Sequence, residues 1–150
     1  MKIIKVSTDN VVSVHDYPEE SFREQNAVLV ELIGNGCEML ECVRPKRLYE
    51  KLRFQCQPTI NEGESVTMLV DEEGLLKDEI VVNPIGSYLY EIDKHGYPIA
   101  GNILFVGEQM SGDDILYFGL SDTNFLRLKY CLDKMVSCLS SEVQVCRKWK

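Results

Sequence analysis

The stretch "VNPIGSYLYEIDKHGYPIAGNILFVGEQ" (Val82–Gln109) decides the fold, because it predicts a helix followed by a buried strand. Asn83 is a favourable helix cap, and Pro84 suits the first helical position, so a helix is expected over residues 83–93. Ile103–Val106 is an uninterrupted apolar run, which is typical of a strand buried on both faces. The stretch therefore predicts a central strand with helices or loops above and below it.

Three glycines in this stretch have structural interpretations. Gly86 lowers the helix propensity of the preceding segment, so the helix is either short or closely packed against a neighbour. Gly101 and Gly107 mark the ends of the predicted strand. They do not form a Gly-x-Gly-x-x-Gly phosphate loop, which follows a strand and opens a helix.

Outward from this stretch, the chain alternates short strands and helices without strict order. Strands are expected at residues 2–6, 11–18, 37–43, 66–70, 75–77, 100–108 and 115–120, with 66–77 forming a hairpin. Helices are expected at residues 21–33, 45–52 and 83–93 and from Ser121 onward. We predict an α+β fold, a single domain with a mixed, largely antiparallel sheet of about six to seven strands and about four helices.

Two of the expected helices carry specific signals. Ser21 and Glu24 have the spacing of a capping box, in which each side chain bonds the backbone amide of the other residue. The last helix has the clearest apolar periodicity of the chain, a stripe at 3-4-3-4 spacing that predicts a main core element. This stripe comprises Phe125, Leu128, Leu132, Met135 and Leu139.

Length and composition bound the protein class. The chain has 150 residues, which suits one domain over 1–150, with residues 45–63 as a candidate insertion. No apolar stretch is long enough to span a membrane, and the first residues lack a signal-peptide core, so we expect a cytoplasmic protein without a membrane partner. The six cysteines should then be free, buried thiols. A net charge of −8 disfavours broad nucleic-acid binding.

One basic segment, "RPKRLYEKLR" (Arg44–Arg53), interrupts this acidic background. Its cations either form a solvated helix face, neutralise nearby acids such as Glu50, or bind an anionic ligand. On a helix, Leu48 and Leu52 would face the core and turn the cations outward. The candidate ligand-binding residues, with two asparagines from the opening stretch, are Arg44, Lys46, Arg47, Lys51, Arg53, Asn83 and Asn102.

Residues 66–128 resemble a domain-of-unknown-function family (number 3846), whose members are small proteins of bacterial phages, plasmids and conjugative elements, mostly of Gram-positive bacteria. The resemblance lies in a strand, an acidic-Gly turn, an Asn-Pro helix start, a Gly-flanked apolar strand and a Gly-Leu before a helix. The matching positions are Asp71, Glu72, Glu73, Gly74, Asn83, Pro84, Gly101, Asn102, Gly107, Gly119 and Leu120. The resemblance implies a fold and a mobile-element origin, and it carries no activity.

No catalytic or metal-binding motif accompanies this fold. Neither His15 nor His95 has a sequence neighbour that forms a triad or a metal site, although a distant cysteine could pair with either. We therefore predict no catalytic residue, metal or cofactor. The expected function is a non-catalytic binding module of mobile-element origin that antagonises host defence by binding a host protein or sequestering a small anionic, nucleotide-type ligand. The alternative is a small enzyme acting on a nucleotide or peptide bond, and homo-oligomerisation stays open in both cases.

Overall fold

The computed structural model describes the backbone of residues 1–19 and 21–148, and the side chains of residues 1–19 and 21–139. Within these residues, six antiparallel strands form one sheet in the order β2-β1-β5-β4-β3, and β6 pairs with β5. The predicted α+β class with a largely antiparallel sheet is confirmed. The strands are β1 (Lys2–Val6), β2 (Val12–Asp16), β3 (Leu40–Val43), β4 (Ser65–Asp71), β5 (Ile103–Ser111) and β6 (Asp114–Phe118).

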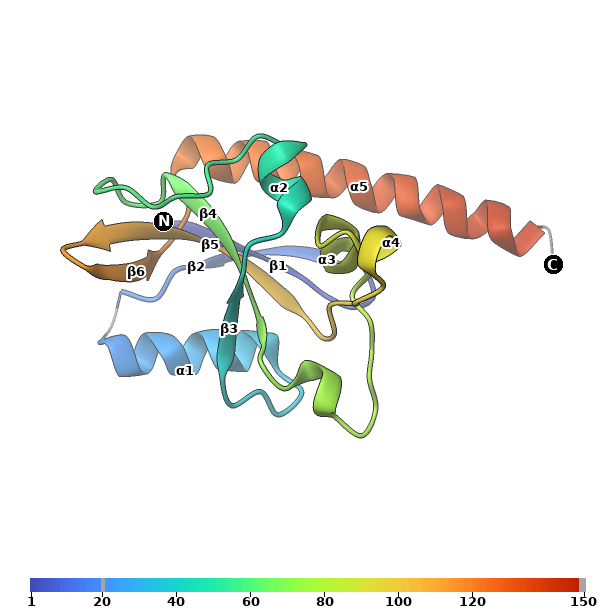
Figure 1. Cartoon of the computed structure of the whole chain (residues 1–150), viewed down its shortest axis with the longest axis horizontal. Coiled ribbons are helices and arrows are strands. Elements are labelled where there is room, and N and C mark those ends of the chain that lie inside the picture. Colours follow the sequence, from blue (N-terminus) through green and yellow to red (C-terminus); the bar gives the residue numbers. More distant parts are fainter. Residues whose placement is uncertain (20, 149–150) are drawn as a thin grey trace.

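Helices cover both faces of this sheet (Figure 1). The α-helices are α1 (Phe22–Ile33), α2 (Lys46–Glu50), α3 (Pro84–Leu89), α4 (Ile92–His95) and α5 (Asp122–Lys148), and Gly74–Leu76 forms a 3-10 turn, η1. Helix α1 packs on one face, while α2, α3 and α5 pack on the other, where α5 extends beyond the end of the sheet (Figure 1). None of the helices described is long and apolar enough to cross a membrane.

The strand β5 is the centre of the fold, as the sequence predicts. Ile103 and Phe105 point into the larger core beneath α2, α3 and α5, while Leu104 and Val106 point into the smaller core against α1. All four side chains are fully buried. Burial on both faces explains why this run carries no polar residue.

The helix expected over residues 83–93 is wrong as one element, because it breaks at Glu91. The Asn83 side chain caps α3 by accepting a hydrogen bond from the Gly86 amide at 3.0 Å, as expected. Glu91 then adopts a left-handed backbone conformation (φ 63°), and α4 starts after it. A Cβ at Gly86 would lie 3.2 Å from side-chain atoms of Ile99 and Ile103, so this glycine permits close packing of α3 on the strand.

The expected hairpin over residues 66–77 is also wrong. Strand β4 pairs with β3 on one edge and with β5 on the other, so neither edge is free for a returning strand. Leu75 and Leu76 instead lie within the η1 turn, and Lys77 follows it. The pairing partners of β4 are distant in the sequence, and local pattern does not reveal them.

Two smaller expectations also differ from the structure. Ser21 stands at the start of α1 but its side chain makes no capping bond, so the capping box with Glu24 is not formed. The strand expected from Cys37 begins only at Leu40, because the Cys37 amide bonds the Gly34 carbonyl in a turn.

The cysteines are free wherever the structure describes their side chains, and they differ in burial. Cys37 is buried, while Cys42, Cys56 and Cys131 are half-buried. Cys138 is exposed, which corrects the expectation that every thiol is buried. The side chain of Cys146 lies outside the described residues.

Candidate functional site

The predicted basic segment does not form one outward-facing cationic surface. Arg44 makes two parallel hydrogen bonds to Glu108, of 2.8 and 2.7 Å, and donates a third to the Cys56 carbonyl. The Glu108 side chain is only 1% exposed. Burial opposes the positive charge of Arg44, but hydrogen bonds to Glu108 and its charge raise the pKa of the guanidinium. Arg44 therefore compensates a buried carboxylate on β5.

Arg47 is likewise paired with a carboxylate of the same molecule. It makes a bidentate pair with Asp93, at 2.6 and 2.8 Å, and donates to the Tyr88 carbonyl at 2.8 Å. Its guanidinium carbon also lies 4.5 Å from the centroid of the Tyr88 ring. Hydrogen bonds from Arg47 lower the pKa of Asp93 to about 2. Arg47 thus connects α2 to α3 and α4.

The other cations of the segment are more accessible. Lys46 and Glu50 form an exposed pair across one helical turn, with nitrogen and oxygen 3.9 Å apart. Lys51 donates to the Tyr88 hydroxyl, and its ammonium lies 5.2 Å from that ring. Arg53 is exposed and lines a polar pocket of about 490 Å³ at the start of α5, in which Glu62 and Glu64 offset the cationic side chains.

The two predicted asparagines stabilise the fold rather than face a ligand. The Asn83 amide donates to the carbonyls of Val6 and Gly101, both at 3.0 Å. Asn102 accepts from the Thr8 amide at 3.1 Å and donates to the Ile33 carbonyl at 2.8 Å. Both side chains therefore hydrogen-bond backbone groups of neighbouring segments and hold those segments together.

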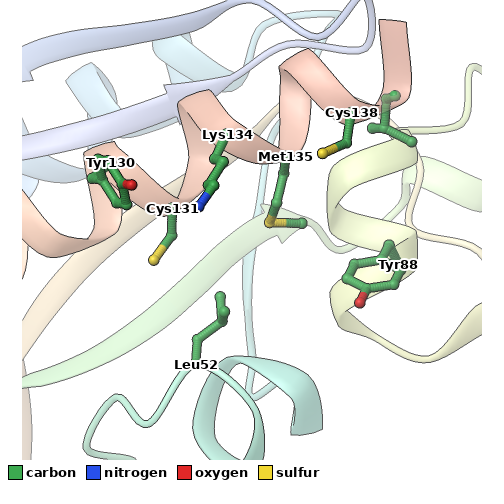
Figure 2. Close-up of a pocket in the computed structure, with 8 residues that line it drawn as sticks. Leu52, Tyr88, Tyr130, Cys131, Lys134, Met135 and Cys138 are labelled. Atoms are coloured by element: carbon green, nitrogen blue, oxygen red, sulfur yellow. The ribbon is translucent and has the colours of Figure 1, made fainter. Parts of the chain in front are cut away.

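An apolar cavity, here called the α5 groove, lies beside this segment. It has a volume of about 470 Å³, and in Figure 2 Cys131 and Met135 point from α5 toward Leu52, with Tyr88 on the neighbouring helix α3. The lining residues are Leu52, Tyr88, Tyr130, Cys131, Lys134, Met135, Cys138 and Leu139. The volume falls in the range of about 300–1,000 Å³ that is common for ligand sites.

The groove forms because the apolar stripe of α5 is longer than the core beneath it. Leu128 and Leu132 are fully buried against the sheet, whereas Met135 and Leu139 are only partly covered. Beneath this later part of α5 lie the segment that follows α2 and the short helix α3, which contribute Leu52 and Tyr88, respectively, to the opposite wall. The exposed apolar side chains are a surface on which a partner can be buried.

Lys134 is the one charged residue among those that line the described part of the α5 groove, in contrast to the acidic protein as a whole. None of the lining residues is acidic. The Lys134 ammonium lies 5.5 Å from the Tyr130 ring, and Lys51 lies beside Tyr88. Among the described side chains, no carboxylate forms an ion pair with Lys51 or Lys134. The groove therefore combines an apolar floor with two available cations.

The histidines have no catalytic partner in the described part of the chain. The His15 ring contacts the Ser13 hydroxyl at 2.9 Å, and His95 contacts the Tyr90 carbonyl and the Tyr97 ring. No three metal-ligating side chains converge among the residues described.

Comparison of the chain with family models, with curated proteins and with solved structures gives no match. The resemblance to the mobile-element family therefore stays a prediction, as does the function that it implies.

Sequence reasoning did not identify the α5 groove. The stripe that includes Met135 and Leu139 was interpreted as core, because periodicity shows which side of a helix is apolar but not how far the neighbouring elements extend. One signal was available: the predicted last helix is much longer than any predicted strand on which it could pack. Tyr130, Lys134 and Cys138, which flank the stripe, carried no separate signal.

Proposed function

We propose that this protein is a non-catalytic binding module whose α5 groove holds an apolar segment of another protein, with acidic residues beside that segment. The observation that carries the proposal is the partly covered apolar stripe of α5, bordered by Lys51 and Lys134. Burial of apolar side chains supplies the affinity, and the two lysines select acidic flanks.

The occupied arginines favour a protein partner over a small anionic ligand. The bidentate forks of Arg44 and Arg47 would be the natural phosphate contacts, but Glu108 and Asp93 occupy them. A nucleotide that used these two forks would have to break both pairs, which would leave the buried Glu108 carboxylate without compensation. An apolar segment needs no such rearrangement.

We place this binding in the setting that the resemblance predicts, a phage or plasmid protein that acts on a host protein in the cytoplasm and antagonises host defence. An enzyme acting on a nucleotide or peptide bond is the competing function. It predicts turnover of a panel of nucleotides and peptides, whereas the binding module predicts none.

The test is partner capture from a Gram-positive bacterial lysate on the immobilised full chain, followed by titration of each captured protein after purification. Met135→Asp places a charge on the groove floor and should weaken binding about tenfold or more. Leu126→Asp is the matched control, because Leu126 is exposed on the same helix outside the groove. Carbodiimide coupling should join Lys51 or Lys134 to an aspartate or glutamate of the partner.

Equal binding by the wild type and Met135→Asp would contradict the proposal. So would coupling of the partner to lysines away from the groove. Each variant is checked first for an unchanged circular dichroism spectrum and thermal midpoint, so that loss of binding is not loss of fold.

A further inference from the structure

The segment between β4 and α3 exposes an unusual concentration of apolar side chains. Leu76 is 80% exposed, and four neighbours are exposed as well. Glu72 and Glu73 precede Leu75 and Leu76, and a second acidic pair at 78–79 separates these from residues 80–82. The segment is therefore both apolar and, even with Lys77, net negative. Residues 72–82, here called the acidic loop, carry the exposed residues Glu72, Glu73, Leu75, Leu76, Asp78, Glu79, Ile80, Val81 and Val82.

The acidic loop is held firmly at both ends. At its start, the Asp71 carboxylate accepts the Glu73 amide at 2.9 Å and pairs with Lys77 at 3.4 Å. At its end, Val82 bridges to Ala100, and the Val81 carbonyl accepts the Gly101 amide at 2.8 Å. The apolar side chains are therefore presented outward by a fixed backbone, which reduces the entropy lost on binding.

The acidic loop is complementary to the α5 groove. The loop offers apolar side chains among carboxylates, and the groove offers an apolar floor beside Lys51 and Lys134 without an acidic lining residue. This is the chemistry that the proposed function assigns to the partner of the groove. Opposite charges on the two surfaces set their orientation, while the apolar contact supplies the affinity.

The two surfaces cannot meet within one molecule. Figure 1 places the η1 turn, the green segment after β4, at one edge of the molecule and α5 at the opposite edge, with the sheet between them. Contact between loop and groove therefore requires two molecules. Because the contacting surfaces differ and lie apart, a pair of molecules still has one free groove, on the molecule that donates its loop, and one free loop, on the other molecule.

We infer that the acidic loop of one copy of this chain occupies the α5 groove of a second copy, with Leu76 as the central apolar contact. The inference rests on the proposed function of the groove as an apolar docking site. It states that, when no other protein is bound, the acidic loop of a second copy occupies the groove. Association is head-to-tail, so it continues into chains or closes into a ring rather than stopping at a symmetric dimer.

Two variants, each with one damaged surface, test this association by sedimentation velocity of the full chain over a wide range of concentration. Leu76→Asp damages the loop and keeps the groove, whereas Cys138→Asp damages the groove at an exposed position and keeps the loop. The wild type should form species larger than a dimer as concentration rises. Each variant alone should stay monomeric, with affinity lowered about tenfold or more. An equimolar mixture of the two should form a heterodimer and nothing larger.

Leu126→Asp is again the control and should associate as the wild type does. A wild type that stays monomeric at every concentration would overturn the inference, as would a mixture without a heterodimer or a wild type that stops at a dimer. The same experiments distinguish failure of this inference from failure of the proposed function. If the wild type is monomeric but captures a partner in a groove-dependent way, only the self-association is wrong. If it self-associates and captures no partner, the groove serves self-association alone.

Discussion

At the scale of single residues, three glycines form a contact that no side chain would allow. A Cβ on Gly107 would lie 2.4 Å from the Gly119 carbonyl oxygen and 2.5 Å from the Gly63 Cα. Gly107 lies inside β5 rather than at its end, where the sequence placed it. Its role is therefore close packing between the central strand, the loop before β4 and the segment after β6.

We expect Gly107→Ala to lower the free energy of unfolding by about 1–3 kcal/mol, or more if the backbone cannot shift. The new methyl group would meet backbone atoms, which cannot rotate away as a flexible side chain can. Urea unfolding measures the change. Ser111→Ala, at the exposed end of the same strand, is the control, and an equal effect of both substitutions would show that the glycine contact is not specific.

The Arg47–Asp93 pair should make stability depend on acid pH. Hydrogen bonds from Arg47 lower the pKa of Asp93 from 3.8 to about 2, so folding favours the charged carboxylate. The stabilisation is complete above the ordinary pKa and is lost as the pH falls toward about 2. Asp93→Asn should therefore unfold at a lower temperature than the wild type at pH 5, and the two midpoints should converge near pH 2.

Thermal unfolding monitored by circular dichroism at both pH values measures this difference. Asp113→Asn, in the turn before β6, controls for the removal of one negative charge. A midpoint difference for Asp93→Asn that is the same at pH 5 and pH 2 would show that the pair contributes nothing through ionisation.

At the scale of elements, α5 is a main part of the core along its first half. Leu128 and Leu132 are fully buried beneath it. Leu128→Ala or Leu132→Ala should each lower the free energy of unfolding by about 2–5 kcal/mol, because each removes a large apolar side chain and leaves a cavity. Leu126→Ala, exposed on the same helix, should change it by less than about 0.5 kcal/mol. Unchanged unfolding of both core variants would mean that α5 does not pack as described.

Elements were predictable from sequence where the signal is local. The apolar run of β5, the Asn83-Pro84 start of α3 and the stripe of α5 all depend on neighbouring residues. The first two are confirmed, while the stripe is core at Leu128 and Leu132 but only partly covered at Met135 and Leu139. The predicted hairpin after β4 is wrong because strand pairing depends on residues far apart in the sequence. Here β4 pairs with β3 and β5 instead. The break at Glu91 was not predicted, because a left-handed backbone conformation at a glutamate has no distinct sequence pattern.

The candidate site was harder to predict than the fold. The cations of the basic segment were visible, but the partners of Arg44 and Arg47 lie far along the chain at Glu108 and Asp93. The sequence does not show that these ion pairs form, so both arginines were interpreted as available to bind an anionic ligand. The α5 groove depends on where α2 and α3 end relative to α5, which is a property of the assembled core.

At the scale of the whole molecule, charge is unevenly distributed. The chain carries a net charge of −8, yet the α5 groove has no acidic lining residue, and the η1 turn of the acidic loop lies at the opposite edge (Figure 1). The net charge makes two copies repel each other at long range, which favours solubility. The proposed contact between loop and groove is therefore local, and it acts only when two molecules approach in one orientation.

The position of β5 at the centre of the sheet also governs how the nascent chain folds. Ile4 of β1 pairs with Phe105 of β5, so the first strand to leave the ribosome must wait for a partner made much later. Until β5 has emerged, the β1–β2 hairpin lacks its neighbour and β4 lacks one of its two pairing strands. Bringing such distant strands together lowers the conformational entropy of the chain before any stabilising contact forms. Topologies of this kind therefore fold slowly. The sheet can therefore be completed only after β5 and its last partner, β6, have been synthesised.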